Sequence, residues 1–115
     1  REPSAELVER AECVGLPADG ERVDLGALLE MLAAREINEG HVEAGGTLCG
    51  ALLRRELLDE LLLYQAACLL GEDGLPTFIL GGPARMEERP EFRVLERIPV
   101  GNDLRMRLAP PYREG

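Results

Sequence analysis

The stretch HVEAGGT, residues 41–47, joins a short apolar segment to a leucine-rich helix and holds the residues best suited to chemistry. Glu43 would end a strand, Gly45-Gly46 would form the turn, and Thr47 would begin the helix. Glycine lets a ligand approach the backbone, and the unpaired N–H groups of a helix N-terminus favour negative charge. The pattern predicts a site for an anionic ligand such as a pyrophosphate, at the carboxyl end of a strand, where open α/β sheets bind ligands.

The same residues also have a purely structural interpretation, which the sequence leaves open. Gly45-Gly46 would then only make a tight strand-to-helix turn that Thr47 caps, because the motif is neither a dinucleotide-binding GxGxxG nor a P-loop. Glu43 alone would be a solvated carboxylate as often as a functional one. His41 has no partner at a recognisable spacing, so we expect a surface or hydrogen-bonded histidine and no catalytic triad.

The elements that must position this turn alternate in type along the chain. Helices are predicted after the N-cap residue Ser4, from the N-cap residue Asp24 to about residue 37, and over residues 48–57 with Thr47 as N-cap. Strands are predicted over residues 12–16, 40–44, 61–67, 91–100 and 103–108, the last two as a hairpin around Gly101-Asn102.

The order of these elements indicates an α/β fold. Strands separated by helices predict right-handed βαβ crossovers, and therefore a mixed, mainly parallel sheet with a C-terminal antiparallel hairpin. The 61–67 strand is apolar on both faces at its start, which predicts a place in the middle of the sheet.

Length, charge and cysteine content limit the class of protein. The 115 residues, 45% of them apolar, predict one domain over residues 1–115. A formal net charge of −9 disfavours nucleic-acid and anionic membrane surfaces, and no apolar run is long enough to cross a bilayer. Cys13, Cys49 and Cys68 fit neither a disulfide framework nor a zinc spacing, so we expect buried free thiols, no metal and a cytoplasmic location.

Two longer stretches carry a family resemblance that covers residues 19–109. INEGHVEAGGTLCGALLRRELLDELLLYQAACLLG, with V-E-A-G-x-T-L-x-G-A-L, and PEFRVLERIPVGNDLRMRLAP, with G-x-D-L-R-x-R-L, together resemble the C-terminal reductase domain of the bifunctional riboflavin biosynthesis deaminase-reductases. The resemblance implies a dihydrofolate-reductase-like three-layer fold. It also implies NADPH-dependent reduction of the ribose of 5-amino-6-(5-phosphoribosylamino)uracil, a small-molecule phosphoribosylaminopyrimidine substrate, to the ribitylamino product.

The resemblance assigns roles to residues of the turn. The family's substrate-contacting acid falls on Glu43, and its NADPH-contacting stretch falls on Gly45, Gly46, Thr47, Leu48, Cys49, Gly50 and Ala51. Two positions depart from the family pattern. Gly46 stands where proline is common, and Cys68 stands where lysine is common, which removes a positive charge near the ligand cleft.

The resemblance also raises the question of extent. The chain opens at Arg1 without methionine, and the first strands of the family domain have no counterpart, so we expect the C-terminal part of a reductase domain that is inactive alone. An exposed strand edge would favour a homodimer. Two alternatives stay open: a non-catalytic fragment or dimerisation module, and a related dihydrofolate-reductase-like reductase with another substrate.

Overall fold

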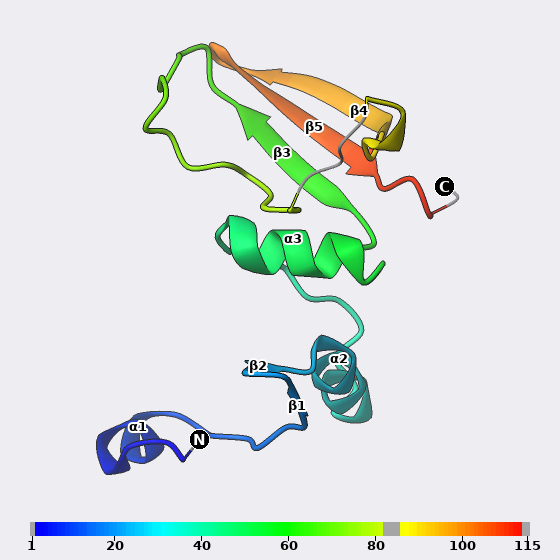
Figure 1. Ribbon diagram of the computed structural model, residues 1–115. Coiled ribbons are helices and arrows are strands. Elements are labelled where there is room, and N and C mark those ends of the chain that lie inside the picture. The colour runs from blue at the N-terminus through cyan, green and yellow to red at the C-terminus, as the bar shows by residue number, and fades with distance from the viewer. Residues whose placement is uncertain (1, 82–85, 114–115) are drawn as a thin grey trace. The chain divides into compact units, whose positions relative to one another are not determined.

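The computed structural model describes residues 2–81 and 86–113 of an α/β chain. They belong to two compact units, Arg1–His41 and Val42–Gly115 (Figure 1), which are described separately below. Within the described ranges, no helix has both the length and the apolar character that a bilayer crossing requires.

The first unit contains two capped helices. α1 (Ala5–Arg10) begins after Ser4, whose hydroxyl accepts a backbone N–H at 3.2 Å. α2 (Leu25–Ala34) begins after Asp24, whose carboxylate accepts a backbone N–H at the same distance. Both predicted N-caps are confirmed, because each side chain satisfies an N–H that the first helical turn leaves unpaired. α2 stops before residue 37, since Glu36 adopts a left-handed φ of 62°.

Two strand predictions in the first half of the chain are wrong. Residues 12–16 are irregular, and the strands that form are β1 (Ala18–Asp19) and β2 (Arg22–Val23), paired antiparallel across a turn with Gly20 at φ 69°. Residues 40–44 are irregular as well. An alternating pattern becomes a strand only when a partner satisfies its backbone groups, and neither segment has a partner strand among the described residues.

The second unit combines a helix with a three-stranded sheet (Figure 1). Its elements are α3 (Gly46–Arg54), β3 (Leu61–Gln65), the 3₁₀ turn η1 (Met86–Glu88), β4 (Arg93–Val100) and β5 (Asp103–Ala109). The strand order is β3-β5-β4. The predicted C-terminal hairpin is confirmed, with Gly101 at φ 60° in the turn between β4 and β5.

Two expectations about the sheet are not met. Every strand pairing in the described part of the chain is antiparallel, so the mainly parallel sheet is not found. β3 lies at an edge of the sheet, and β5 is central because it pairs with both β3 and β4. The cause is the short turn before β5, which can join only antiparallel strands and brings β5 back between its two neighbours.

Side chains of β5 alternate between the two faces of the sheet. Leu104, Met106 and Leu108 lie on one face, while Arg105 and Arg107 lie on the other. The buried residues of the unit come from α3 and from the end of β5; they include Leu52, Leu53, Leu108, Ala109 and Pro110. The apolar face of β5 therefore contributes to the core, and the opposite face carries a row of charges.

Residues of the C-terminal segment bond to the connection between α3 and β3. The Tyr112 hydroxyl accepts a hydrogen bond from the Leu58 N–H at 3.0 Å, and the Arg113 guanidinium pairs with the Asp59 carboxylate at 2.8 Å. Burial raises the pKa of the Tyr112 phenol, so the hydroxyl stays neutral at physiological pH. These contacts fix the point at which the chain enters β3.

Candidate functional site

The predicted glycine turn forms the N-terminus of α3, and the helix begins two residues earlier than expected. Gly45 is the N-cap, with extended φ and ψ of −75° and 175°, and Gly46 is the first helical residue. The Thr47 cap is therefore wrong, because Thr47 already lies inside the helix. Because Gly45 has no side chain, no side-chain hydrogen bond caps the helix. The backbone carbonyl of Gly45 accepts the Cys49 N–H at 3.1 Å, which closes the first turn.

This arrangement suits an anion electrostatically. The N–H groups of Gly46, Thr47 and Leu48 precede the first intrahelical hydrogen bond, so the helix itself gives them no acceptor. They lie at the positive end of the helix dipole. A Cβ built on Gly45 would meet no atom within 4 Å, so the approach to these groups from the side of Gly45 is open.

Gly46 and Gly50 serve a different purpose from Gly45. A Cβ at Gly50 would collide with the Ile79 carbonyl oxygen, and one at Gly46 would lie 2.7 Å from the Pro76 carbonyl oxygen. The Ile79 N–H donates to the Gly46 carbonyl at 2.9 Å. We call residues 76–79 the strap, because this irregular segment lies directly against the glycine face of α3. The group that comes close to Gly50 is therefore the backbone of the chain itself.

Arg54 belongs to the same helix face, and its role was not anticipated. Its guanidinium Nη1 donates to the Ile79 carbonyl at 2.8 Å. Positions 46, 50 and 54 follow one another at intervals of four, the spacing of neighbours along one face of a helix. The pattern G-x₃-G-x₃-R is therefore the sequence signal that could have identified this face.

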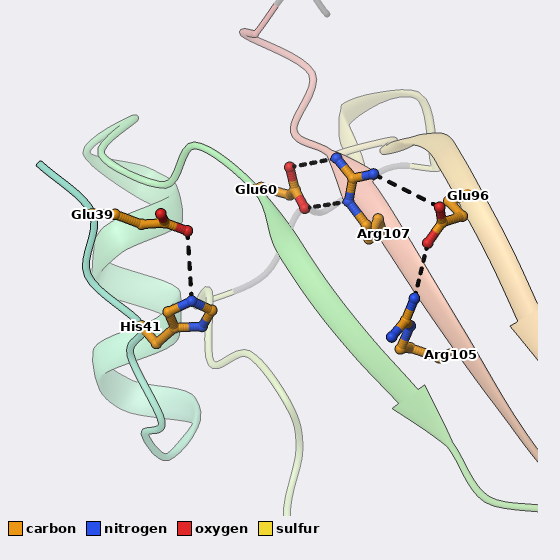
Figure 2. A network of polar contacts seen from close by, with 6 residues as sticks. All are labelled: Glu39, His41, Glu60, Glu96, Arg105 and Arg107. Atoms are coloured by element: carbon orange, nitrogen blue, oxygen red, sulfur yellow. Dashed lines mark hydrogen bonds and ion pairs between the residues drawn. The ribbon is translucent and has the colours of Figure 1, made fainter. Parts of the chain in front are cut away.

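The remaining site residues lie in exposed or partly buried positions. Glu43 is exposed in the irregular segment just before α3, as are Thr47 and Leu48 in its first turn, whereas Ala51 is half-buried. Chain continuity alone brings Glu43 and the turn together. In the other unit, His41 is exposed and its Nε2 lies 3.6 Å from a Glu39 carboxylate oxygen (Figure 2), in agreement with a surface histidine.

The cysteines depart from expectation in their burial. Cys13 and Cys68 are exposed and Cys49 is half-buried, so the prediction of buried thiols is wrong. The Cys49 thiol donates to the Ala44 carbonyl at 3.5 Å across the glycine turn. Among the described residues, no three His, Cys, Asp or Glu side chains are grouped so that they could hold a metal ion.

A network of charges crosses the sheet on the face that carries Arg105 and Arg107 (Figure 2). Arg107 on β5 forms a two-point hydrogen bond with Glu60, at 2.7 and 3.2 Å, and lies 3.9 Å from the second acid, Glu96 on β4. Glu96 also accepts from Arg105 at 3.0 Å. The Arg105 Nε is buried without a hydrogen-bond partner in the described part of the chain. Sequence reasoning missed this network, because its members meet only through strand register.

The network makes stability depend on pH in a defined direction. The hydrogen bond from Arg107 holds the pKa of Glu60 below its usual range. A lowered carboxyl pKa adds stability above the unfolded-state value, about 4.3, and that stability is lost as pH falls through the folded-state pKa. Glu60→Gln should therefore be less stable than the parent at pH 7, with the difference shrinking below about pH 4.

Urea unfolding at pH 7 and at low pH measures the effect of Glu60→Gln. Since both partners are more than one-third exposed, solvent screening keeps the effect small. Glu72→Gln, which removes a carboxylate from an exposed loop position, is the matched control. Equal losses for the two variants at pH 7 would show that the Arg107 contact contributes nothing.

A pocket of about 430 Å³ lies near the C-terminal end of α3, away from the glycine turn. Apolar groups of Leu53, Leu80 and Tyr112 line it, together with Arg54 and Glu56 among its charged residues. None of the predicted ligand-binding residues takes part in its lining. The pocket and the glycine turn are thus two distinct features.

Comparisons with known proteins agree with the resemblance in the sequence. The chain is 37% identical over 108 residues to "Riboflavin biosynthesis protein RibD" of Escherichia coli (strain K12), covering 94% of this chain and 29% of that protein. It is 33% identical over 89 residues to "5-amino-6-(5-phosphoribosylamino)uracil reductase" of Buchnera aphidicola subsp. Acyrthosiphon pisum, covering 77% of this chain and 43% of that protein. The chain thus spans less than half the length of either relative.

A solved structure shows the same architecture. "Acinetobacter baumannii RibD, form 2" matches with a TM-score of 0.78 and 29% sequence identity, over 94% of this chain and 29% of that one. The family model described as "RibD C-terminal domain" matches residues 2–105, which is nearly the whole sequence and extends across both units. The chain belongs to the RibD C-terminal domain family.

Proposed function

We propose that this chain is part of an NADPH-dependent 5-amino-6-(5-phosphoribosylamino)uracil reductase of riboflavin biosynthesis. The observation that carries the proposal is the family match across residues 2–105, supported by the name of the Buchnera relative. Both units would belong to one dihydrofolate-reductase-like domain of three layers, of which this chain forms the C-terminal part. Because the chain spans less than half the length of either relative, the activity is proposed for the whole protein.

The N-terminus of α3 fits the cofactor's pyrophosphate. A first turn without a side-chain cap, N–H groups without an intrahelical acceptor and open space at Gly45 are the features that such a group requires. We assign direct backbone contacts to Gly45, Gly46, Thr47 and Leu48, while Cys49, Gly50 and Ala51 shape the helix behind them. When bound, NADPH would supply the hydride. The turn would bind and orient the cofactor, and Glu43 would orient the substrate.

Two alternatives rest on specific observations. The place of β3 at an edge of the described sheet favours a non-catalytic fragment or dimerisation module, because an edge strand offers a pairing surface, and a homodimer would be the natural assembly. Cys68, where the family commonly has lysine, favours a related reductase with another substrate. In either form we propose a cytoplasmic protein, since its three cysteines are free thiols. Because the net charge is −9, we propose small anionic ligands as partners and not nucleic acids or membranes.

The test is hydride transfer by the full-length protein that carries this chain. NADPH oxidation with 5-amino-6-(5-phosphoribosylamino)uracil is expected for the parent. Glu43→Gln should raise the substrate KM about 10- to 100-fold, because it removes a charged hydrogen-bonding group from the substrate site, while the KM for NADPH stays nearly constant.

Glu39→Gln is the matched control for that substitution, since Glu39 is an exposed carboxylate of the preceding segment. It should leave both constants unchanged. No NADPH oxidation by the parent would reject the proposed reaction. Equal effects of the two substitutions would reject the role of Glu43.

A further inference from the structure

The strap is attached to α3 through both polar backbone groups of one residue. The Ile79 N–H donates to the Gly46 carbonyl at 2.9 Å, and the Ile79 carbonyl accepts from Arg54 Nη1 at 2.8 Å. Side chains on a helix lean toward its N-terminus, so Arg54 reaches back over Gly50 to meet the strap. The absence of a side chain at Gly50 leaves the space that the Ile79 carbonyl occupies.

Gly46 links the strap to the glycine turn. Its carbonyl holds the Ile79 N–H, and its own N–H is the first of α3. The Pro76 carbonyl lies where a Gly46 Cβ would otherwise be, so the strap covers one side of the first helical turn. The other side, at Gly45, is open. A ligand at these N–H groups thus meets a turn that is supported from behind by the strap.

We infer that Arg54 is a positioning residue: it keeps the strap docked on the Gly46–Gly50 face and thereby fixes the turn that binds the cofactor. The inference rests on the proposed function, because it concerns the affinity of that turn for NADPH. In this role Arg54 would act through the strap and not by touching the ligand. Among the described residues, its charged hydrogen bond is the one side-chain hydrogen bond to the Ile79 carbonyl. Loss of this bond would remove one of the two attachments of Ile79 to α3 and loosen the turn.

The experiment uses the full-length protein with three substitutions and two measurements. Arg54→Gln removes the charge, and Arg54→Lys keeps the charge and one donor. Arg97→Gln removes an equal charge from an exposed position on β4. Amide hydrogen exchange at Ile79 reports docking of the strap without ligand, and the KM for NADPH and kcat report the site.

Arg54→Gln is expected to speed exchange at Ile79 about 3- to 10-fold and to raise the KM for NADPH by a similar factor, with kcat nearly unchanged. Arg54→Lys should show only a small part of both effects, and Arg97→Gln should show neither. If Arg54→Gln sped exchange at Ile79 but left the KM for NADPH unchanged, the inference would be overturned. Unchanged exchange at Ile79 would also overturn it. Neither outcome would contradict the proposed function. A parent protein that neither binds nor oxidises NADPH would overturn both.

Discussion

Replacing Gly50 by alanine is expected to lower the free energy of unfolding by about 1–3 kcal/mol, the usual cost of forcing extra volume into a closely packed contact. The new Cβ would collide with the Ile79 carbonyl oxygen and approach the Ile79 carbonyl carbon to 2.8 Å. Both are backbone atoms, so no side-chain rotation relieves the clash. Alanine regains about 1 kcal/mol of helix propensity, but the strap must move away and lose its hydrogen bonds to Gly46 and Arg54.

Urea unfolding followed by circular dichroism measures the effect at Gly50. Gly40→Ala is the matched control, since a Cβ there meets no atom within 4 Å and the residue lies outside helices and strands. The control should change stability by less than about 0.5 kcal/mol. If Gly50→Ala proved as stable as the control, the strap would not lie against α3 as the structure shows.

Replacing Gly45 by aspartate is expected to move stability and cofactor binding in opposite directions. Aspartate is a better N-cap than glycine and adds negative charge at the positive end of the helix, which together stabilise by about 0.3–1 kcal/mol. The backbone at Gly45 has the extended φ and ψ that an N-cap aspartate adopts, and its Cβ would meet nothing within 4 Å. The same carboxylate would compete with the pyrophosphate for the N–H groups, and NADPH binding should weaken at least about tenfold.

Gly45→Asn separates the effect of the negative charge of aspartate from the effect of the size of its side chain. Asparagine caps a helix as well as aspartate does but carries no charge, so it should stabilise the fold with a smaller loss of NADPH affinity. Titration calorimetry and thermal unfolding of the full-length protein give the two quantities. Unchanged NADPH affinity in the aspartate variant would mean that the turn is structural only. Gly45 is the right position for this test, because a side chain at Gly46 would also disturb the strap.

Local sequence was sufficient wherever neighbouring residues form the structure. Ser4 and Asp24 cap α1 and α2 as predicted, because an N-cap side chain bonds to backbone only a few residues away. The hairpin around Gly101 also follows from a short polar turn between two alternating segments. The predicted cap at Thr47 lies two residues after the observed N-cap, Gly45, since glycine can fill an N-cap without leaving a polar side chain as a signal.

Strand pairing was beyond the reach of local pattern. Residues 12–16 and 40–44 alternate like strands but find no partner in the described structure, and β3 reads as a central strand yet lies at an edge. Alternation reports which side of a segment prefers burial, whereas order and direction in a sheet depend on which distant segment supplies its hydrogen bonds.

In the candidate site, too, some features follow from local sequence and others depend on tertiary contacts. The sequence by itself determined that a glycine-rich turn opens a helix next to Glu43, and it carried the family resemblance, because both lie in a contiguous run of residues. Only the tertiary structure decided that Gly46 and Gly50 receive the strap, that Arg54 holds it, and that Glu60, Arg107 and Glu96 form one charge network. These contacts join residues far apart in the chain, and their partners become neighbours only when packing and strand register bring them together.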